Sequence, residues 1–423
     1  MLQVQFIRQN KELVLERLAL RNFKEISVVE EVLSLDDRRK KLTLEYDETQ
    51  AQVNASSKEI GKLMASGDKA GAEARKAAVA TLKERLQPIN DELKQVEEAL
   101  TLALYKIPNL PHKSVPAGKT PEDNEVVRTG GNMPTLQEGA KPHWELATQY
   151  DLIDFELGTR ITGSGFPVYK NKGARLQRAL IQYFLDYNTG NGYTEFQPPY
   201  MVNAESATGT GQLPDKEGQM YHVTEDGFYL IPTAEVPVTN IYRDTIIKES
   251  ELPIKMTAYT PCFRREAGSY GKDVRGLNRL HQFDKVEIVQ LVHPDTSYHV
   301  LEEMVGHVEK LIQSLELPYR ILRLCGGDMG FTSALTYDFE VYSAAQGRWL
   351  EVSSVSNFEG YQTNRLKARF KDGNGKSQLV HSLNGSSLAL PRILACLLEN
   401  HQTAEGIAIP AAVQPYFGSN KIG

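Results

Sequence analysis

The chain has 423 residues, 24% of them charged, and a formal net charge of −6. This length permits a sizeable core and favours two domains, and the composition is ordinary for a globular protein. The sequence has neither a run of eighteen apolar residues nor a charged-then-apolar N-terminal leader, so we expect no membrane insertion and no secretion.

The three cysteines, Cys262, Cys325 and Cys396, stand far apart in the sequence. This spacing fits a reducing cytoplasm and offers no local pair for a zinc site. The net negative charge, taken alone, argues against a nucleic-acid partner. However, residues 1–108 contain 18 Lys+Arg and 18 Asp+Glu, so this part is neutral, and a basic cluster such as residues 38–41 could still contact phosphates.

Residues 28–104 carry a heptad pattern that predicts two long helices. The small, polar stretch 65–71 between them predicts a tight turn, so the helices should form an antiparallel hairpin, each about 57 Å long for roughly 38 residues. An arm that reaches along an extended partner and a dimerisation coiled coil would both show this pattern. The apolar positions are Val32, Leu35, Leu42, Tyr46, Val53, Ile60 and Leu63, then Val79, Leu82, Leu86, Ile89, Leu93, Val96 and Leu100.

Pro108 and Pro111 predict the end of the second helix, so we expect an N-terminal helical arm at 1–108 and a second domain at 109–423. Strands arriving in runs, without regular alternation with helices, predict an α+β fold on an antiparallel sheet. Residues 371–376 predict a hairpin turn. Helices are expected at 172–188, 298–315 and 388–399, and strands at 194–196, 227–230, 256–263, 282–292, 319–324, 336–342, 348–357, 361–370 and 379–383.

The segment 263–287, FRREAGSYGKDVRGLNRLHQFDKVE, is the most informative part of the chain. Arg264 and Glu266 precede a Gly-rich loop, and Arg279, Phe283 and Glu287 follow it at four-residue steps. An aromatic ring among arginines suits a purine nucleotide, because Arg stacks on π faces and pairs with phosphates. By composition alone, a charged β-hairpin with a floppy turn would be the favoured interpretation, but the order and spacing of these residues carry more information than the composition does.

This segment resembles motif 2 of the class II aminoacyl-tRNA synthetases, an antiparallel hairpin that holds ATP and the amino acid carboxylate. Gly192–Val202, GYTEFQPPYMV, resembles motif 1, whose strand usually lies at the dimer interface. Leu383–Leu394, LNGSSLALPRIL, resembles motif 3, in which Arg392 follows Pro391 where most of the class has Glu. That departure is typical of the seryl branch.

Two further segments resemble the seryl branch. Ile231–Glu235, IPTAE, resembles its Thr-x-Glu loop, and Leu350–Asn357, LEVSSVSN, resembles its Glu-x-Ser-Ser strand. Cys325–Phe331 and Tyr361–Arg365 depart slightly from the forms usual in the family, at Gly327 and at Thr363-Asn364. The predicted N-terminal arm is also typical of this branch, so the resemblance to the seryl-tRNA synthetase family, bacterial type, covers essentially the whole chain.

The resemblance implies a ligase of protein biosynthesis that activates L-serine with ATP to seryl-adenylate and then transfers serine to the 3′ end of tRNA(Ser), and also of tRNA(Sec). It implies a cytoplasmic homodimer that uses Mg²⁺ and has no membrane partner, with the coiled-coil arm gripping tRNA. Two alternatives stay open: a paralogue that activates an amino acid for another carrier, and a catalytically dead RNA-binding protein. The arm argues against the first, and the presence of the motif residues argues against the second.

The resemblance also implies roles for individual residues. Arg264 and Arg392 are the expected catalytic residues, the first bridging the serine carboxylate and the α-phosphate and the second holding the γ-phosphate. Phe283 is expected to stack on adenine. Residues expected to bind L-serine are Thr233, Ala234, Glu235, Arg264, Glu287, Asn384 and Ser386. Residues expected to bind ATP are Arg264, Arg265, Glu266, Arg279, Phe283, Glu351, Val352, Ser353, Ser354 and Arg392. Residues expected to bind Mg²⁺ are Glu351 and Ser354.

The loop Ala267–Asn278 contains Gly268, Gly271 and Gly276. Because glycine gives the backbone additional freedom, we expect this loop to be mobile. In the context of the family resemblance, we expect it to sense the acceptor end of the tRNA.

Overall fold

The computed structural model describes residues 1–267 and 275–423, so Gly268 and Gly271 lie outside the described residues. The chain divides into two compact units. One consists of residues 1–19 and 23–108, and the other of residues 20–22 and 109–423. Within the described ranges, every helix is too short or too polar to cross a membrane.

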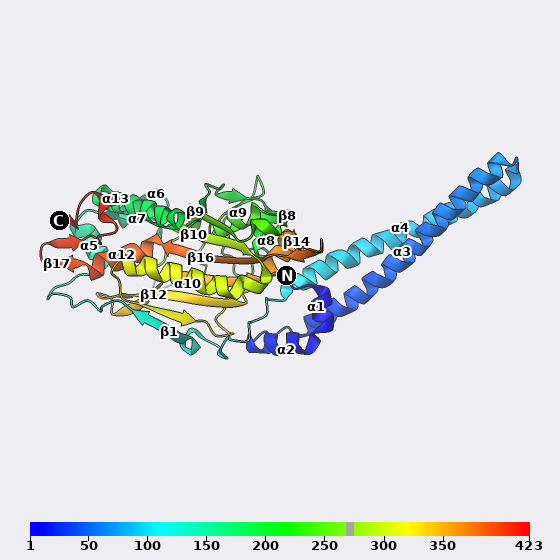
Figure 1. Ribbon diagram of the computed structural model, residues 1–423. Helices are drawn as coiled ribbons and strands as arrows, with labels where there is room; N and C mark the ends of the chain where they lie inside the picture. The colour runs from blue at the N-terminus through cyan, green and yellow to red at the C-terminus, as the bar shows by residue number, and fades with distance from the viewer. Residues whose placement is uncertain (268–274) are drawn as a thin grey trace. The chain divides into compact units, whose positions relative to one another are not determined.

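The first unit is helical, as the heptad pattern predicts. It contains α1 (Val4–Gln9), α2 (Lys11–Leu20), α3 (Ser27–Ala65) and α4 (Lys69–Lys106). Figure 1 shows α3 and α4 side by side and antiparallel. Heptad positions such as Val53 and Val79 are buried, while most of the residues between heptad positions are exposed. The turn is tighter than expected, because Asp68 already caps α4 by accepting a hydrogen bond from Gly71 N at 2.9 Å.

A buried charge interrupts the apolar seam near the start of α3. Asp36 is 2% exposed, and its carboxylate contacts Arg8 of α1, Arg39 and Lys40, each at 2.8 Å. Burial alone would raise the pKa of Asp36, but the hydrogen bonds from Lys40, Arg39 and Arg8 outweigh it and hold the pKa well below its usual range. The heptad pattern gave no sign of this charged centre.

The second unit is built on an eight-stranded sheet with the order β1-β11-β12-β13-β16-β10-β9-β4. All neighbours are antiparallel except β4, which runs parallel to β9 at one edge. This matches the α+β fold expected from the sequence. The strands are β1 (Glu125–Gly130), β4 (Thr194–Glu195), β9 (Ile254–Phe263), β10 (Gln282–Val292), β11 (Tyr319–Arg323), β12 (Leu335–Ser343), β13 (Arg348–Glu359) and β16 (His381–Ala389).

In the described ranges, four small sheets accompany the large one. Their strands are β2 (Ile153–Asp154) with β3 (Val168–Tyr169); β5 (Met201–Val202), β7 (Phe228–Leu230) and β6 (His222–Val223); β15 (Ser377–Leu379), β14 (Arg369–Lys371) and β8 (Ile246–Lys248); and β17 (Gln402–Thr403), β18 (Gly406–Ala408) and β19 (Lys421–Ile422). The turn expected at 371–376 joins β14 to β15, as predicted.

Helices cover the large sheet and close the core. Helices α10 and α12 pack against β13 and β16, and α7 packs against β9 and β10 (Figure 1). Phe184, Leu301, Phe339 and Ile393 are fully buried in the resulting cluster. The helices are α5 (His143–Gln149), α6 (Phe155–Ile161), α7 (Asn171–Gly190), α8 (Ala204–Thr210), α9 (Glu235–Asn240), α10 (Ser297–Ser314), α11 (Tyr361–Leu366), α12 (Leu390–Asn400) and α13 (Gln414–Phe417).

The strand expected at 361–370 is wrong. Residues 361–366 form α11, the left-handed residue Lys367 ends it at φ 54°, and the strand begins only at Arg369. Four of the six helical residues are buried, and α11 packs against α8. Strand propensity is a weak guide where tertiary packing decides the conformation.

We predict that Asp36→Asn destabilises the first unit by about 1–3 kcal/mol, because it leaves three cations facing an uncharged amide. Faster amide hydrogen exchange in peptides covering residues 4–9 and 30–40 would measure the loss. Because the pKa of Asp36 is lowered on folding, its contribution is present above the ordinary aspartate pKa and is lost as pH falls. The difference from wild type should therefore shrink below about pH 4.

Asp37→Asn is the matched control, because the Asp37 side chain is 63% exposed and contacts only Arg8 among the described ion pairs. Exposed pairs contribute little, so this variant should exchange like wild type. Equal effects of the two substitutions would contradict the role of Asp36.

Candidate active site

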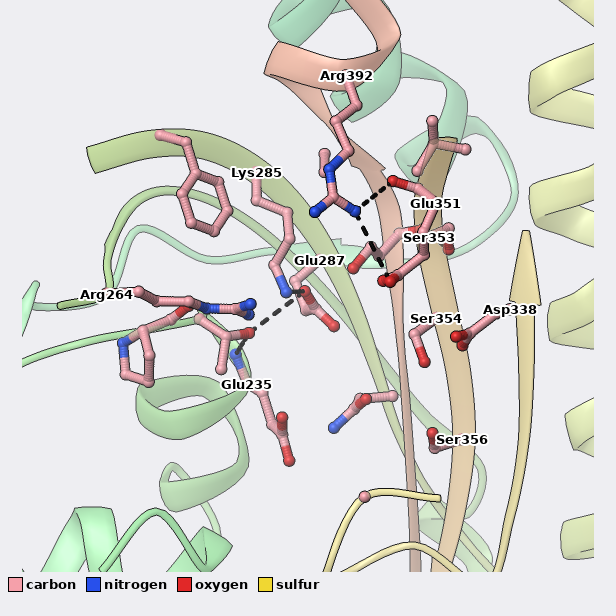
Figure 2. Close-up of a pocket in the computed structure, with 18 of the residues that line it drawn as sticks. Glu235, Arg264, Lys285, Glu287, Asp338, Glu351, Ser353, Ser354, Ser356 and Arg392 are labelled. Atoms are coloured by element: carbon pink, nitrogen blue, oxygen red, sulfur yellow. Dashed lines mark hydrogen bonds and ion pairs between the residues drawn. The ribbon is translucent and has the colours of Figure 1, made fainter. Parts of the chain in front are cut away.

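A cavity of about 590 Å³ opens in the second unit. The central strands β10, β13 and β16 supply much of its wall. The loop before α9, the residues just after β9, the start of α12, β12 and the segments 212–219 and 324–333 also contribute. Figure 2 shows Arg264, Lys285 and Arg392 converging on it from three different elements. Sequence-predicted residues that line the cavity are Thr233, Glu235, Arg264, Glu266, Arg279, Phe283, Glu287, Glu351, Val352, Ser353, Ser354, Asn384, Ser386 and Arg392.

Two expected residues do not line the cavity. Ala234 is fully buried in an apolar cluster with Met256 and Val289. The backbone N–H of Arg265 donates to Gln219 O at 2.9 Å, which connects the loop before β6 to the end of β9.

Strand β10 places an aromatic ring and two charges on one face of the sheet. Phe283, Lys285 and Glu287 alternate along the strand and therefore project the same way. Lys285 Nζ lies 2.5 Å from Glu287 Oε2, and the two side chains are 8% and 2% exposed. Thr233 Oγ1 donates to the same oxygen at 3.4 Å. Lys285 was missed in the sequence, although its position midway between Phe283 and Glu287 in a strand would have indicated it.

Glu235 adds a second carboxylate to this charged centre. Burial and then the neighbouring charge of Glu287 raise the pKa of Glu235 to about 7, and a hydrogen bond from Gln362 opposes the rise. Gln362 Nε2 donates to Glu235 Oε1 at 2.5 Å and to Thr210 O at 3.2 Å, so the side chain that holds Glu235 is itself bonded to α8. The buried carboxylate of Glu287 and the partly buried carboxylate of Glu235 lie near one lysine and form a site that favours an added cation such as an ammonium group.

Arginine and aromatic side chains meet at another part of the wall. The guanidinium carbon of Arg264 lies 5.3 Å from the centre of the Phe283 ring, and Arg264 Nε donates to Pro232 O at 3.4 Å. Arg279 Nη1 pairs with Glu266 Oε2 at 2.9 Å. This pairing of cations with an aromatic face suits a purine and its phosphates.

A β-bulge in β13 places two oxygen ligands on the same side of the sheet. Asp338 pairs with Ser354 and Glu340 pairs with Glu351, so Val352 is an extra residue in the ladder. Without it, Glu351 and Ser354 would face opposite sides, because their spacing is odd. The bulge therefore makes the expected Mg²⁺ pair geometrically consistent.

Asp338, which the sequence analysis missed, reinforces this acidic region. Burial and then Glu351 raise the pKa of Asp338 well above its usual value, and its Oδ1 is buried with no hydrogen-bond partner in the described part of the chain. Within that part, no group of three or more His, Cys, Asp or Glu forms a complete metal cage. Hard oxygens from Glu351 and Ser354 nevertheless fit Mg²⁺, which usually takes few protein ligands and completes its shell with water and phosphate.

Arg392 stands at the first turn of α12, directly after Pro391, a residue favoured at the start of helices. Its Nη1 donates to Glu351 O at 2.7 Å and lies 3.7 Å from Glu351 Oε2. Its Nε donates to Asn278 O at 3.1 Å. The guanidinium is therefore fixed between β13 and the segment that precedes β10. Lys285 on β10 and Arg264, which directly follows β9, also line the cavity, so it has three cations from three separate segments, an arrangement that can bind a polyanion.

Comparisons with known proteins agree along the whole chain. The model of the seryl-tRNA synthetase N-terminal domain matches residues 1–111, and that of the tRNA synthetase class II core domain (G, H, P, S and T) matches residues 221–401. A serine–tRNA ligase from Salinibacter ruber is 48% identical and covers 100% of this chain and 99% of its own. A serine–tRNA ligase from Neisseria meningitidis serogroup B is 50% identical, and the match covers 99% of this chain and 98% of that protein.

Solved structures show the same similarity. The crystal structure of seryl-tRNA synthetase from Pyrococcus horikoshii complexed with ATP has a TM-score of 0.91 and 32% identity, covering 100% of this chain and 99% of its own. A cytoplasmic serine–tRNA ligase from Naegleria fowleri in complex with AMP has a TM-score of 0.87 and 27% identity, covering 100% and 98%.

We predict that Glu235→Gln changes how stability depends on pH. The pKa of Glu235 is about 7 in the folded chain and about 4.3 when unfolded, so the folded state binds more protons and wild-type stability falls as pH rises across this interval. The substitution removes the titration. Relative to wild type, the free energy of unfolding of the variant should rise by roughly 2 kcal/mol between about pH 5 and pH 8, measured by calorimetric unfolding. The exposed Glu225→Gln is the control, and parallel pH curves for wild type and Glu235→Gln would contradict the prediction.

Proposed function

This chain belongs to the seryl-tRNA synthetase family, and we propose that its cavity activates L-serine with ATP and that the seryl group is then transferred to the 3′ end of tRNA(Ser). The observation that carries this proposal is the convergence of Arg264, Arg392 and the Lys285–Glu287 pair in one cavity. This cavity thus combines a site for a polyanion with a site for a small zwitterion.

Activation is an in-line displacement at phosphorus. A carboxylate oxygen of serine attacks the α-phosphorus of ATP, and the bond from that phosphorus to the pyrophosphate oxygen breaks, giving seryl-adenylate and pyrophosphate. Both reactants are anions, so fixed cations dominate catalysis. Arg264 bridges the serine carboxylate and the α-phosphate, while Arg392 holds the γ-phosphate. No base is required, because the attacking carboxylate is already ionised at neutral pH.

The rest of the nucleotide lies along the arginine-rich wall. Phe283 stacks on adenine, and Glu266 accepts from the adenine amino group. Arg279 contributes to phosphate or purine binding beside Glu266, with which it already pairs at 2.9 Å. Arg265 lies next to this wall without lining it and supports it through its backbone contact to Gln219.

Serine occupies the charged centre on β10. Glu287, with Glu235 beside it, receives the ammonium group, and Thr233 holds the Glu287 carboxylate through the 3.4 Å hydrogen bond. Ser386, which pairs with Glu287 in the sheet, and Asn384 line the end that faces the substrate hydroxyl. A site built to bond that hydroxyl rejects alanine strongly, whereas an extra methyl group has to be excluded by shape. The role of Ala234 is backbone support, because its side chain is buried elsewhere.

Glu351 and Ser354 would hold Mg²⁺, and Val352 and Ser353 support them through the bulge. Ser353 Oγ donates to Ser386 O at 2.6 Å, which ties this strand to the serine end of the cavity. Mg²⁺ bound there supplies positive charge that offsets the phosphate oxygens. Asp338 pairs with Ser354 in the neighbouring strand, and a cation bound at that position would favour the charged form of its carboxyl group.

The long helices of the first unit grip the tRNA by shape and backbone contacts, with local Lys and Arg facing phosphates. Because this grip does not depend on reading bases, we extend the proposal to tRNA(Sec). We also propose a cytoplasmic homodimer. The three free, buried cysteines fit that compartment, and the short edge strand β4, with exposed Thr194 and Glu195, leaves a sheet edge that a second copy would cover.

Amino-acid-dependent pyrophosphate exchange tests the chemistry. We expect exchange with serine and not with alanine, and a loss of about 10²–10³ in kcat for Arg264→Ala, because a preorganised charge at the transition state is removed. Arg160→Ala, on an exposed turn of α6, is the control. Exchange that prefers another amino acid would overturn the serine assignment, and no exchange at all would favour the dead RNA-binding alternative.

A shortened arm separates tRNA binding from activation. Arg85 Nη2 contacts Glu45 Oε1 at 2.8 Å, so residues 46–84 can be replaced by a short Gly turn between neighbouring positions. We expect unchanged exchange and at least about a tenfold loss of tRNA charging, since phosphate contacts along the arm are removed. Charging by wild type should also weaken as salt rises. Normal charging by the shortened chain would favour a structural role for the arm, whereas a wild-type chain that exchanges pyrophosphate but charges no tRNA would favour the alternative of another carrier.

A further inference from the structure

A buried histidine–glutamate pair lies outside the proposed substrate contacts. His143 of α5 and Glu399 of α12 are both fully buried, and His143 Nδ1 lies 2.7 Å from Glu399 Oε1. The His143 backbone N–H donates to the same oxygen at 3.0 Å, and Gln346 Nε2 donates to it at 3.1 Å. Ser343 Oγ donates to the other oxygen. Burial would raise the pKa of Glu399, but the hydrogen bonds from His143 and Ser343 and the electrostatic interaction with His143 together outweigh it and hold the pKa below its usual value.

The other ring nitrogen of His143 supports the segment that enters β10. Leu277 N donates to His143 Nε2 at 2.8 Å. A backbone N–H can only donate, so Nε2 carries no proton and the single ring proton is on Nδ1, where it is donated to Glu399. Gly276 lies against the same ring with φ +64°, and a Cβ there would stand 2.2 Å from Nε2. Gly276 therefore serves close packing here, in addition to the freedom expected from the sequence.

Two more contacts hold the same segment. Asn278 Nδ2 donates to Gln346 Oε1 at 2.9 Å, and Gln346 is itself bonded to Glu399. The guanidinium carbon of Arg275 lies 4.5 Å from the centre of the Trp144 ring, next to His143. Residues 275–278, called the stem below, are thus gripped by the start of α5.

Helix α12 connects the stem to the cavity. Arg392 and Glu399 are seven residues apart, so they lie on one face of the helix, two turns apart. Glu399 reaches the stem at Leu277 through His143, and Arg392 Nε donates directly to Asn278 O at 3.1 Å. The position of the Arg392 guanidinium therefore depends on where the stem is held.

We propose that His143, as a neutral imidazole protonated on Nδ1, is a positioning residue that fixes the stem against α12 and thereby orients Arg392 for the phosphates of ATP. This inference rests on the ATP-binding role of Arg392 proposed above. It goes beyond that role because His143 and Glu399 touch neither the cavity nor a substrate.

A matched pair of amide substitutions tests the two ring nitrogens separately. At position 143, the side-chain amide of Asn would stand near the place of the histidine Nδ1, and the side-chain amide of Gln would reach near the place of Nε2. His143→Asn keeps a donor for Glu399 but leaves the buried Leu277 N–H without an acceptor, so the KM for ATP should rise about tenfold. His143→Gln restores the acceptor and should stay within about threefold of wild type. The KM for serine should change by less than about twofold in both.

Two controls exclude general loss of packing. His381→Asn alters another buried histidine, whose Nδ1 lies 2.9 Å from Ser297 Oγ, and should leave the KM for ATP unchanged. Gly276→Ala forces the stem away from His143 without altering either member of the pair, and should reproduce the ATP-specific loss. If His143→Asn does not fold, the Gly276→Ala result decides.

Amide hydrogen exchange at Leu277 gives a readout that does not require activity. It should be faster in His143→Asn than in His143→Gln. The positioning role of His143 would be overturned if the two variants had equal amide hydrogen exchange at Leu277 and equal KM values for ATP. It would also be overturned if the KM for serine rose as much as the KM for ATP. A wild-type chain that shows no serine-dependent exchange of pyrophosphate into ATP would overturn the proposed function instead. Amide hydrogen exchange at Leu277 would still decide the role of His143.

Discussion

The ion pair between Lys285 and Glu287 is the constraint on which the cavity depends. Taking two such charges out of water costs several kcal/mol for each ion, and an apolar pair of similar size would often give a more stable fold. The pair is tolerated because the atoms are 2.5 Å apart and Thr233 adds a hydrogen bond. The presence of this costly ion pair in the central strand β10, with Glu235 beside it, therefore indicates a role in binding a charged substrate and not in stabilising the fold. The fold holds charges in fixed positions, where they need little reorganisation when a charged substrate binds.

The large sheet converts this local pair into a site. Alternation along β10 sets Phe283, Lys285 and Glu287 on one side, and the bulge at Val352 returns Glu351 to the side of Ser354. Neighbouring strands and α12 hold these groups at fixed separations. Side chains on a packed sheet are positioned more accurately than side chains on loops, which matters for chemistry that depends on angstrom-scale alignment.

Much of this organisation could be predicted from the sequence, for identifiable reasons. The helical hairpin follows from a long heptad pattern, and the segment 263–287 carries its chemistry in adjacent positions. Part of what was missed depends on contacts between distant segments. Asp338 is opposed to Ser354 only by strand register, Asp36 is buried against Arg8 only by helix packing, and His143 lies far in sequence from the stem. Lys285 is different, because alternation along β10 already sets it beside Glu287. Residues 361–366 read as a strand locally, but packing against α8 makes them a helix.

The net charge of −6 at first argues against a site for ATP and RNA, yet the local arrangement reverses that expectation. Three of the cations that line the cavity have a carboxylate beside them: Arg279 has Glu266, Lys285 has Glu287, and Arg392 has Glu351. A carboxylate beside each cation lowers the cost of holding that cation in a partly dehydrated wall. In the proposed function, phosphate oxygens would compete for the guanidinium groups, and Glu351 would then be available to a metal ion and Glu287 to an ammonium group. A site that exchanges partners in this way needs no excess of positive charge over the whole chain.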